Sequence, residues 1–166
     1  SLSCRGNRVV QCDDAGLREE TVEICQEGSR CVDGACVTLC GAEGNDKASY
    51  QGCEYWAVDL DNADVDVPGG VSPAAAQFAV VVSNVNAEDV EVVAWASDDG
   101  VAEREVLRTT VRGGEIEVLN LPPRSIVGSG MGFNAYRISA SQAVIAYQFN
   151  PLNNTDTAFS NDASLL

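Results

Sequence analysis

The placement of the cysteines constrains this chain more than any other feature of its sequence. Seven cysteines fall within the first 53 residues, and the rest of the 166-residue chain contains none. They are Cys4, Cys12, Cys25, Cys31, Cys36, Cys40 and Cys53. No Cys-x-x-Cys pair occurs, which disfavours a zinc knuckle or a thioredoxin-like redox site. Dense cysteines in a short polar segment predict a disulfide framework formed in an oxidising compartment.

Residues 1–39 are predicted to form a small disulfide-rich module. The run from Cys4 to Cys12 favours a hairpin that turns at Gly6-Asn7, and residues 21–25 alternate as a strand does. Apolar residues are too few for a core, so disulfides must supply the stability. A spacer module fits better than a protease inhibitor, because no exposed reactive loop is recognisable.

An odd number of cysteines leaves one thiol over. Its partner would lie on a part of the protein outside this sequence, or the thiol is free. We expect Cys40 to pair with Cys53, which would close the polar loop between them at the entry to the second domain.

Beyond residue 40 the pattern changes to short strand-forming runs separated by turns. A first strand is expected to start at Glu54. Further runs rich in β-branched, apolar or aromatic residues follow at 77–83, 89–96, 104–108, 115–121, 135–139 and 143–149. This spacing predicts that residues 40–166 form an all-β domain, an antiparallel β-sandwich or a jelly-roll-like fold. Trp56 is expected to anchor its core, the alternative being an aromatic ring that stacks on a ligand.

Composition excludes several classes of function. The formal net charge of −15 would repel nucleic acid and anionic lipid, so neither is expected as a partner. Histidine is absent, which removes the usual general base and the usual nucleophile pairs. No run of eighteen apolar residues is present, so no membrane span is predicted. We expect no enzyme and no cofactor. A carboxylate-based glycosidase built on Asp98 and Asp99, or on the acidic residues 59–66, ranks last.

One acidic segment could bind a cation. Its carboxylates occur at nearly alternate positions, as Asp59, Asp61, Asp64 and Asp66. Calcium prefers several oxygen ligands, so these four side chains are candidate calcium ligands. The segment lacks the glycine and the flanking helices of an EF-hand loop. A solvated acidic strand edge is therefore the simpler interpretation.

Four pieces of the sequence carry a family resemblance. They are Gly-Cys-Glu-Tyr-Trp (52–56), Gln-Phe-Ala-Val-Val-Val-Ser-Asn (77–84), Asn-Ala-Tyr-Arg (134–137) and AYQFNPLNNTDTAFSNDASLL (146–166). In this order they resemble the IgGFc-binding-protein N-terminal domain family, in its bacterial surface-protein branch, over residues 40–166. The resemblance implies extracellular binding or adhesion and implies no chemistry. Residues 1–39 are similar to small cysteine-rich modules that precede this domain in bacterial surface proteins.

The C-terminal stretch appears in the sequence without all the strands that we expect to cover it. Residues 143–149 are typical of a central strand with apolar side chains on both faces, and residues 163–166 look like the start of another strand. We expect the covering strands to come from a longer chain or from a neighbouring subunit. Alternatively, the loop at 153–162 folds back and the sandwich closes on its own strands.

These features together predict a secreted or cell-surface protein. Its expected function is non-catalytic binding or adhesion, with an unidentified protein or glycan as ligand. The alternative is a structural subunit or spacer of an extracellular fibre or mosaic protein. Self-association would favour that alternative.

Overall fold

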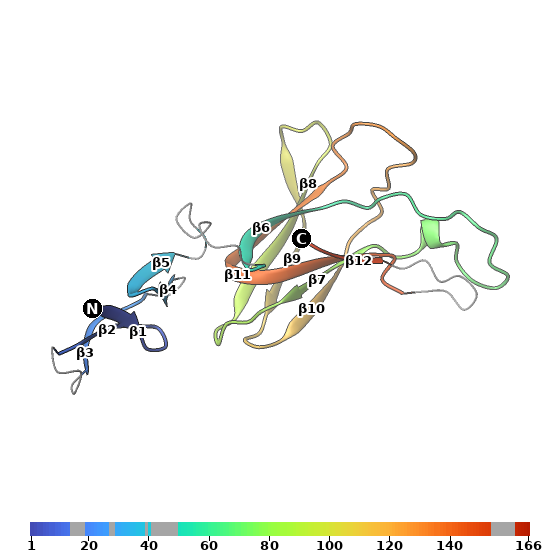
Figure 1. The fold of residues 1–166 in the computed structure, drawn as a ribbon. Coiled ribbons are helices and arrows are strands. Elements are labelled where there is room, and N and C mark those ends of the chain that lie inside the picture. Colours follow the sequence, from blue (N-terminus) through green and yellow to red (C-terminus); the bar gives the residue numbers. More distant parts are fainter. Residues whose placement is uncertain (14–18, 27–28, 39, 41–49, 154–161) are drawn as a thin grey trace. The chain divides into compact units, whose positions relative to one another are not determined.

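The computed structural model describes residues 1–13, 19–26, 29–38, 40, 50–153 and 162–166 (Figure 1). It divides into two compact units, Ser1–Ser49 and Tyr50–Leu166, so the boundary falls later than the one predicted after residue 39. Within the described residues the regular structure is all strand, apart from one short 3-10 turn, η2 (Pro73–Ala75). None of those residues forms a helix long and apolar enough to cross a membrane. The loops predicted at 41–51 and 153–162 lie mostly outside the described residues.

The described residues of the first unit form five short strands. They are β1 (Leu2–Cys4), β2 (Arg8–Cys12), β3 (Glu19–Ile24), β4 (Ser29–Val32) and β5 (Ala35–Thr38). The first three form an antiparallel sheet in the order β1-β2-β3, and the last two form a separate hairpin. Gly6 has a positive φ of 61° in the turn between β1 and β2, which is where the sequence predicted a turn.

The β4–β5 hairpin turns at Asp33 and Gly34. Both residues have positive φ, 51° and 81°, as a two-residue hairpin turn of the primed type requires. A side chain at position 34 would also lie 2.8 Å from the backbone of Leu2, so only glycine fits there. The Asp-Gly pair is a strong hairpin signal in the sequence, and no hairpin was predicted at this position.

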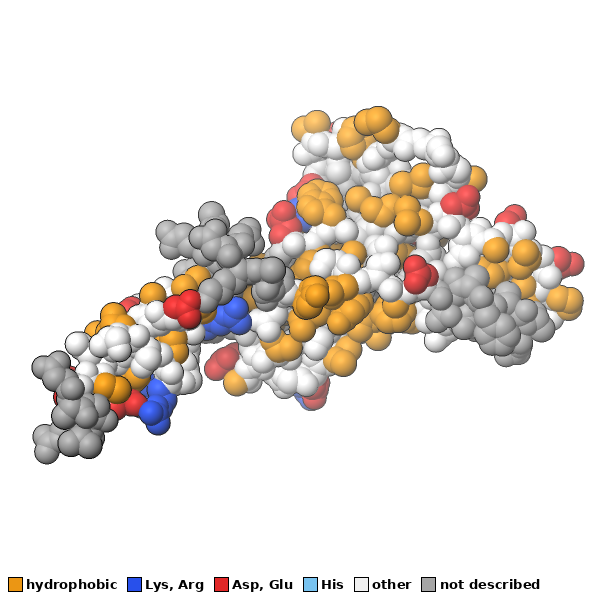
Figure 2. Space-filling model, in the orientation of Figure 1, with side chains coloured by type: hydrophobic (Ala, Val, Ile, Leu, Met, Phe, Trp, Pro, Cys, Tyr) orange, Lys and Arg blue, Asp and Glu red, His pale blue; other side chains and the backbone are white. Residues whose placement is uncertain are grey.

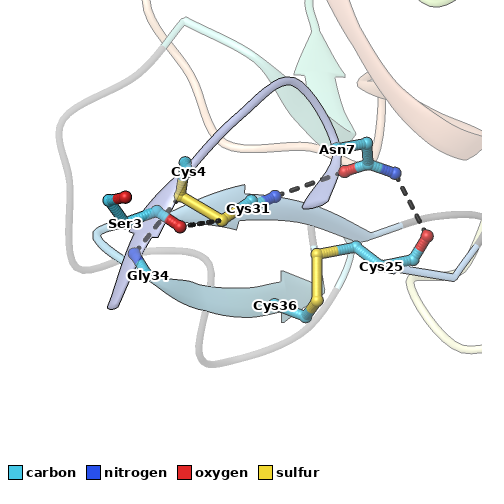
Figure 3. Close-up of a disulfide and its surroundings, with 7 residues drawn as sticks. All are labelled: Ser3, Cys4, Asn7, Cys25, Cys31, Gly34 and Cys36. Atoms are coloured by element: carbon cyan, nitrogen blue, oxygen red, sulfur yellow. Dashed lines mark hydrogen bonds between the residues drawn. A yellow bond between two sulfur atoms is a disulfide. The ribbon is translucent and has the colours of Figure 1, made fainter. Parts of the chain in front are cut away.

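Disulfides link the hairpin to the three-stranded sheet. Cys31 of β4 bonds to Cys4, and Cys36 of β5 bonds to Cys25 directly after β3 (Figure 3). Asn7 supports the same junction, because its amide donates to the Cys25 carbonyl and accepts from the Cys31 N–H, both at 3.2 Å.

The three remaining cysteines are two disulfide-bonded residues and one thiol. Cys40 and Cys53, which the sequence predicted as a pair, are both disulfide-bonded. Cys12 is the odd thiol, free and exposed. The structure therefore identifies Cys12 as the cysteine left over from the three disulfides.

The second unit is an antiparallel sandwich of seven strands. They are β6 (Gly52–Ala57), β7 (Ala79–Ser83), β8 (Val90–Ser97), β9 (Glu103–Val111), β10 (Ile116–Asn120), β11 (Tyr136–Asn150) and β12 (Asp162–Leu165). The sequence predicted two strands where β11 is a single long one. Its pairing with β6 is irregular between Ser139 and Val144, at the gap between the two predicted strands.

The long strand β11 belongs to both layers of the sandwich (Figure 1). Its first half pairs with β6 and β8, and β9 extends that layer beyond β8. Its second half pairs with β12 and β7, and β10 extends that layer beyond β7. The two layers therefore share one strand, and the core lies between them.

Alternation along the strands fills that core. Val90, Val92 and Ala94 point inward from β8, as their predicted common face requires. Phe78 stacks on Tyr136 with 6.3 Å between ring centroids. Tyr55, rather than the predicted Trp56, contributes the buried ring of β6, and its hydroxyl donates to the Val144 carbonyl at 2.5 Å.

The C-terminal segment closes on the same chain. In β12, Leu165 lies opposite Tyr147 of β11, and the Leu166 N–H donates to the Ala146 carbonyl at 3.0 Å. Leu166 packs against the core. The predicted strand at 163–166 is thus present as β12, and it pairs with β11.

Candidate ligand-binding groove

Three side chains form a row across the outer face of the first layer. Arg137 of β11 lies directly opposite Trp56 of β6 on one side and opposite Trp95 of β8 on the other. All three point outward, because their neighbours Tyr55, Ala94 and Tyr136 fill the core. Trp56 is 57% exposed, which is unusual for so large an apolar side chain.

Arg137 is held in place by carboxylates on both sides. Its guanidinium donates to the two oxygens of Glu103 at 2.8 and 2.5 Å, and to Glu54 at 3.3 Å. It also lies over the Trp95 ring, 5.5 Å from the centroid. These hydrogen bonds, chiefly those that Glu103 accepts, raise the pKa of Arg137, and the same bonds lower the pKa of Glu103. The row is thus a fixed array of charge between two indole rings.

Two loops turn this row into a groove. Val101 and Phe133 stand beside it, and the hollow that they enclose with the two tryptophans has a volume of about 360 Å³. Phe133 lies against Gly100, where an added Cβ would come within 2.3 Å of its ring. Gly100 also has a φ of 74°, so there are two reasons why this position in the turn between β8 and β9 requires glycine.

Arg124 fixes the loop that carries Phe133. Its guanidinium donates to the carbonyls of Ser97 and Phe133, each at 2.6 Å, and to Asp98 at 2.6 Å. This one side chain therefore joins the turn after β8 to the loop before β11. The ion pair lowers the pKa of Asp98.

The four candidate calcium ligands are not gathered into one site. The buried Asp59 accepts hydrogen bonds from the Arg124 N–H at 3.1 Å and the Ser125 hydroxyl at 2.9 Å. The other three have separate places: Asp61 accepts from the Gly128 N–H, Asp64 accepts from the Ser72 hydroxyl, and Asp66 is exposed. No group of three or more acidic or cysteine side chains among the described residues could hold a metal ion. The calcium prediction therefore gains no support, and Asp59 instead anchors the loop beside the groove.

The carboxylates considered for glycosidase chemistry also have structural partners. Asp98 pairs with Arg124, and Asp99 accepts from the N–H groups of Val101 and Ala102, each at 2.8 Å. These contacts lower the pKa of both aspartates. A general acid needs the opposite shift, because it must carry its proton near neutral pH.

The expectation for Trp56 was wrong, and the sequence held the signal that corrects it. Tyr55 and Trp56 are adjacent in a strand, so only one of them can face the core. Glu54 has the same parity as Trp56, which marks that face as the outer one. The other groove residues, Trp95, Glu103, Phe133 and Arg137, were not identified as a site, because their proximity depends on strand order.

Comparison with known proteins identified no relative of this chain. No family model matches the chain, and no curated protein or solved structure does so. The family resemblance described above therefore stays an expectation from the sequence, and the function must be argued from the groove itself.

Proposed function

We propose that this chain is a non-catalytic binding or adhesion module of a secreted or cell-surface protein, and that the groove holds its ligand. The observation that carries the proposal is the outward row of Trp56, Arg137 and Trp95. Aromatic and arginine side chains are enriched where proteins bind partners, since they offer large contact areas with polar ends. Trp56 lies in one hollow with the exposed side chains of Val101 and Phe133, and contiguous exposed apolar side chains of this kind mark ligand-binding grooves.

The disulfides support the extracellular part of the proposal. Three disulfides in a short chain fit an oxidising compartment. The net charge of −15 disfavours nucleic acid and acidic lipid surfaces as ligands. The resemblance of residues 40–166 to a bacterial surface-protein family agrees with both points.

The test is binding by the 166-residue chain to printed glycans and to peptide and protein panels, with the chain displayed as a multimer. We expect at least one class of probe to bind, and the Trp56→Ala variant to lose that binding. Trp56 is exposed, so this variant should keep the melting temperature of the parent. Binding that survives Trp56→Ala unchanged would place the ligand elsewhere and contradict the proposal.

A second candidate function has its own observation. The outer face of the other layer carries an apolar row in register across four strands, consisting of Val118, Val81, Tyr147 and Leu165. Figure 2 shows hydrophobic side chains gathered over the region of β7, β10 and β11. Exposed apolar faces of this kind mark interfaces, so the chain would act as a self-associating structural subunit. Sedimentation of the parent and of a Tyr147→Lys variant tests this, and a parent that remains monomeric at high concentration would exclude it.

A further inference from the structure

We propose that the ligand of the groove is a neutral glycan chain, stacked on the indole of Trp56 and hydrogen-bonded to the Glu103–Arg137–Glu54 array. This inference rests on the proposed function and names its ligand. Four steps lead to it, and each of them excludes or favours one class of ligand.

The first step is the charge of the groove. Arg137 supplies one positive charge, but Glu103 and Glu54 both pair with it, so the array is net negative. Its guanidinium has no excess charge to offer an acidic ligand, and the chain as a whole carries −15. Sulfated or carboxylated ligands would therefore be repelled.

The second step is the place that a cationic ligand would need. Aromatic sites bind ammonium groups by placing them over the ring face. At Trp95 this position is already taken, because the guanidinium carbon of Arg137 lies 5.5 Å from the ring centroid. A lysine or quaternary ammonium ligand would have to displace an arginine that is fixed by two carboxylates.

The third step concerns an extended peptide. Proline-rich segments also dock in aromatic grooves, and their backbone carbonyls need donors because this helix has no internal hydrogen bonds. Of the two indole N–H groups in the groove, that of Trp95 already donates to the Ser139 hydroxyl at 2.9 Å and is not available to a peptide carbonyl. Only the indole N–H of Trp56 is left for a peptide backbone, which disfavours a ligand that needs a donor at every turn.

The last step is the ligand class that remains compatible with the groove, a neutral sugar chain. A pyranose ring has a face of C–H bonds that packs on an indole, and hydroxyls at its edge that both donate and accept. The groove offers the same combination, because the exposed ring of Trp56 lies beside the carboxylate–guanidinium array. The row continues from Trp56 over two strands to Trp95, about 10 Å, so a chain of linked sugars fits its length better than a single ring.

The experiment compares four forms of the 166-residue chain: the parent, Trp56→Ala, Trp56→Phe and Ile116→Ala. Ile116 is a matched control, since it is 63% exposed against 57% for Trp56 and lies on the other layer. Titration calorimetry with cellohexaose, maltohexaose and xylohexaose is run beside heparin fragments and a proline-rich peptide library. Melting curves confirm that every variant is folded.

We expect at least one neutral oligosaccharide to bind, with the affinity lowered about tenfold or more by Trp56→Ala. Trp56→Phe should recover most of it, and Ile116→Ala should change nothing. Binding of peptides through Trp56, without any neutral glycan, would overturn the glycan inference and leave the proposed function standing. Preferred binding of heparin would also overturn the inference. If no probe needs Trp56, both proposals fail.

Discussion

The two units of this chain use the same strand geometry but are stabilised in different ways. In the first unit the buried apolar residues among those described are Val9, Val10 and Cys25. In the second, the core cluster draws residues from six of the seven strands and includes Phe78, Tyr136 and Ile138. Small cores cannot offset the conformational entropy that folding removes, so the first unit depends on its covalent links. The contrast indicates that each unit should fail under a different treatment.

The largest expected effect is a core truncation in the sandwich. Phe78→Ala removes a buried ring that stacks on Tyr136, and such truncations cost about 3–5 kcal/mol. We expect the sandwich transition in urea to move to lower concentration, with hydrogen exchange in β1 to β5 unchanged. Ile116→Ala serves as the control, because an exposed position should change little. Equal loss of protection in both units would show that they do not fold independently.

The converse test is removal of a disulfide from the first unit. Cys4 and Cys31 close a loop of 27 residues, for which the chain-entropy estimate is roughly 3–4 kcal/mol. The double variant Cys4→Ser/Cys31→Ser should therefore lose exchange protection in β1 to β5 and keep it in the sandwich. Cys12→Ser, which removes only the free thiol, should have no effect. Full protection of β1 to β5 in the double variant would mean that packing, and not covalent linkage, holds this unit.

A smaller effect is expected from two glycines of the first unit. Gly6 and Gly34 both have positive φ, but only at Gly34 does an added Cβ meet another residue, 2.8 Å from Leu2. Gly6→Ala should cost about 1–2 kcal/mol from backbone strain alone. Gly34→Ala should cost about 1–3 kcal/mol more, because the β4–β5 turn must move away from β1. Thermal melts of the two variants measure the difference, and equal losses would contradict the close approach.

Local sequence patterns were enough to predict the fold class. Alternation placed Val90, Val92 and Ala94 on one face, and the turn residues separated most of the strands. What failed was the division of the last long strand. The single strand β11 was predicted as two strands. The residues after Ser139, where its pairing with β6 is irregular, have the sequence pattern of a turn.

The candidate groove could not be predicted from local sequence patterns, because it depends on which strands are neighbours in the sheet. Trp56, Trp95 and Arg137 are far apart along the chain and meet only through the order β6-β11-β8. The sequence does contain the parity that puts Trp56 outside, as argued above. It does not contain the neighbours of that tryptophan. The acidic segment illustrates the opposite error, because spacing alone cannot show that Asp59 turns inward toward Ser125.

The smallest expected effect is the response of the sandwich to acid. Asp98 and Glu103 both have lowered pKa values, caused chiefly by hydrogen bonds from Arg124 and Arg137. A carboxylate with a lowered folded-state pKa stabilises the fold fully above its usual pKa, 3.8 for Asp98 and 4.5 for Glu103. That contribution is lost as the pH falls through the lowered value. Because both groups are exposed, the effect should be modest and should weaken in high salt.

Melting curves of the parent and of Glu103→Gln, taken between about pH 6 and pH 3, isolate this contribution. At pH 6 the variant should melt below the parent, since it lacks the charged partner of Arg137. The difference should shrink as the pH falls through the lowered pKa of Glu103, where the carboxylate of the parent becomes protonated as well. Glu117→Gln is a control on another exposed strand position of the same unit. Equal melting temperatures of parent and Glu103→Gln at pH 6 would mean that the charge of Glu103 does not stabilise the groove, and that Trp95 and Glu54 alone hold Arg137 in place.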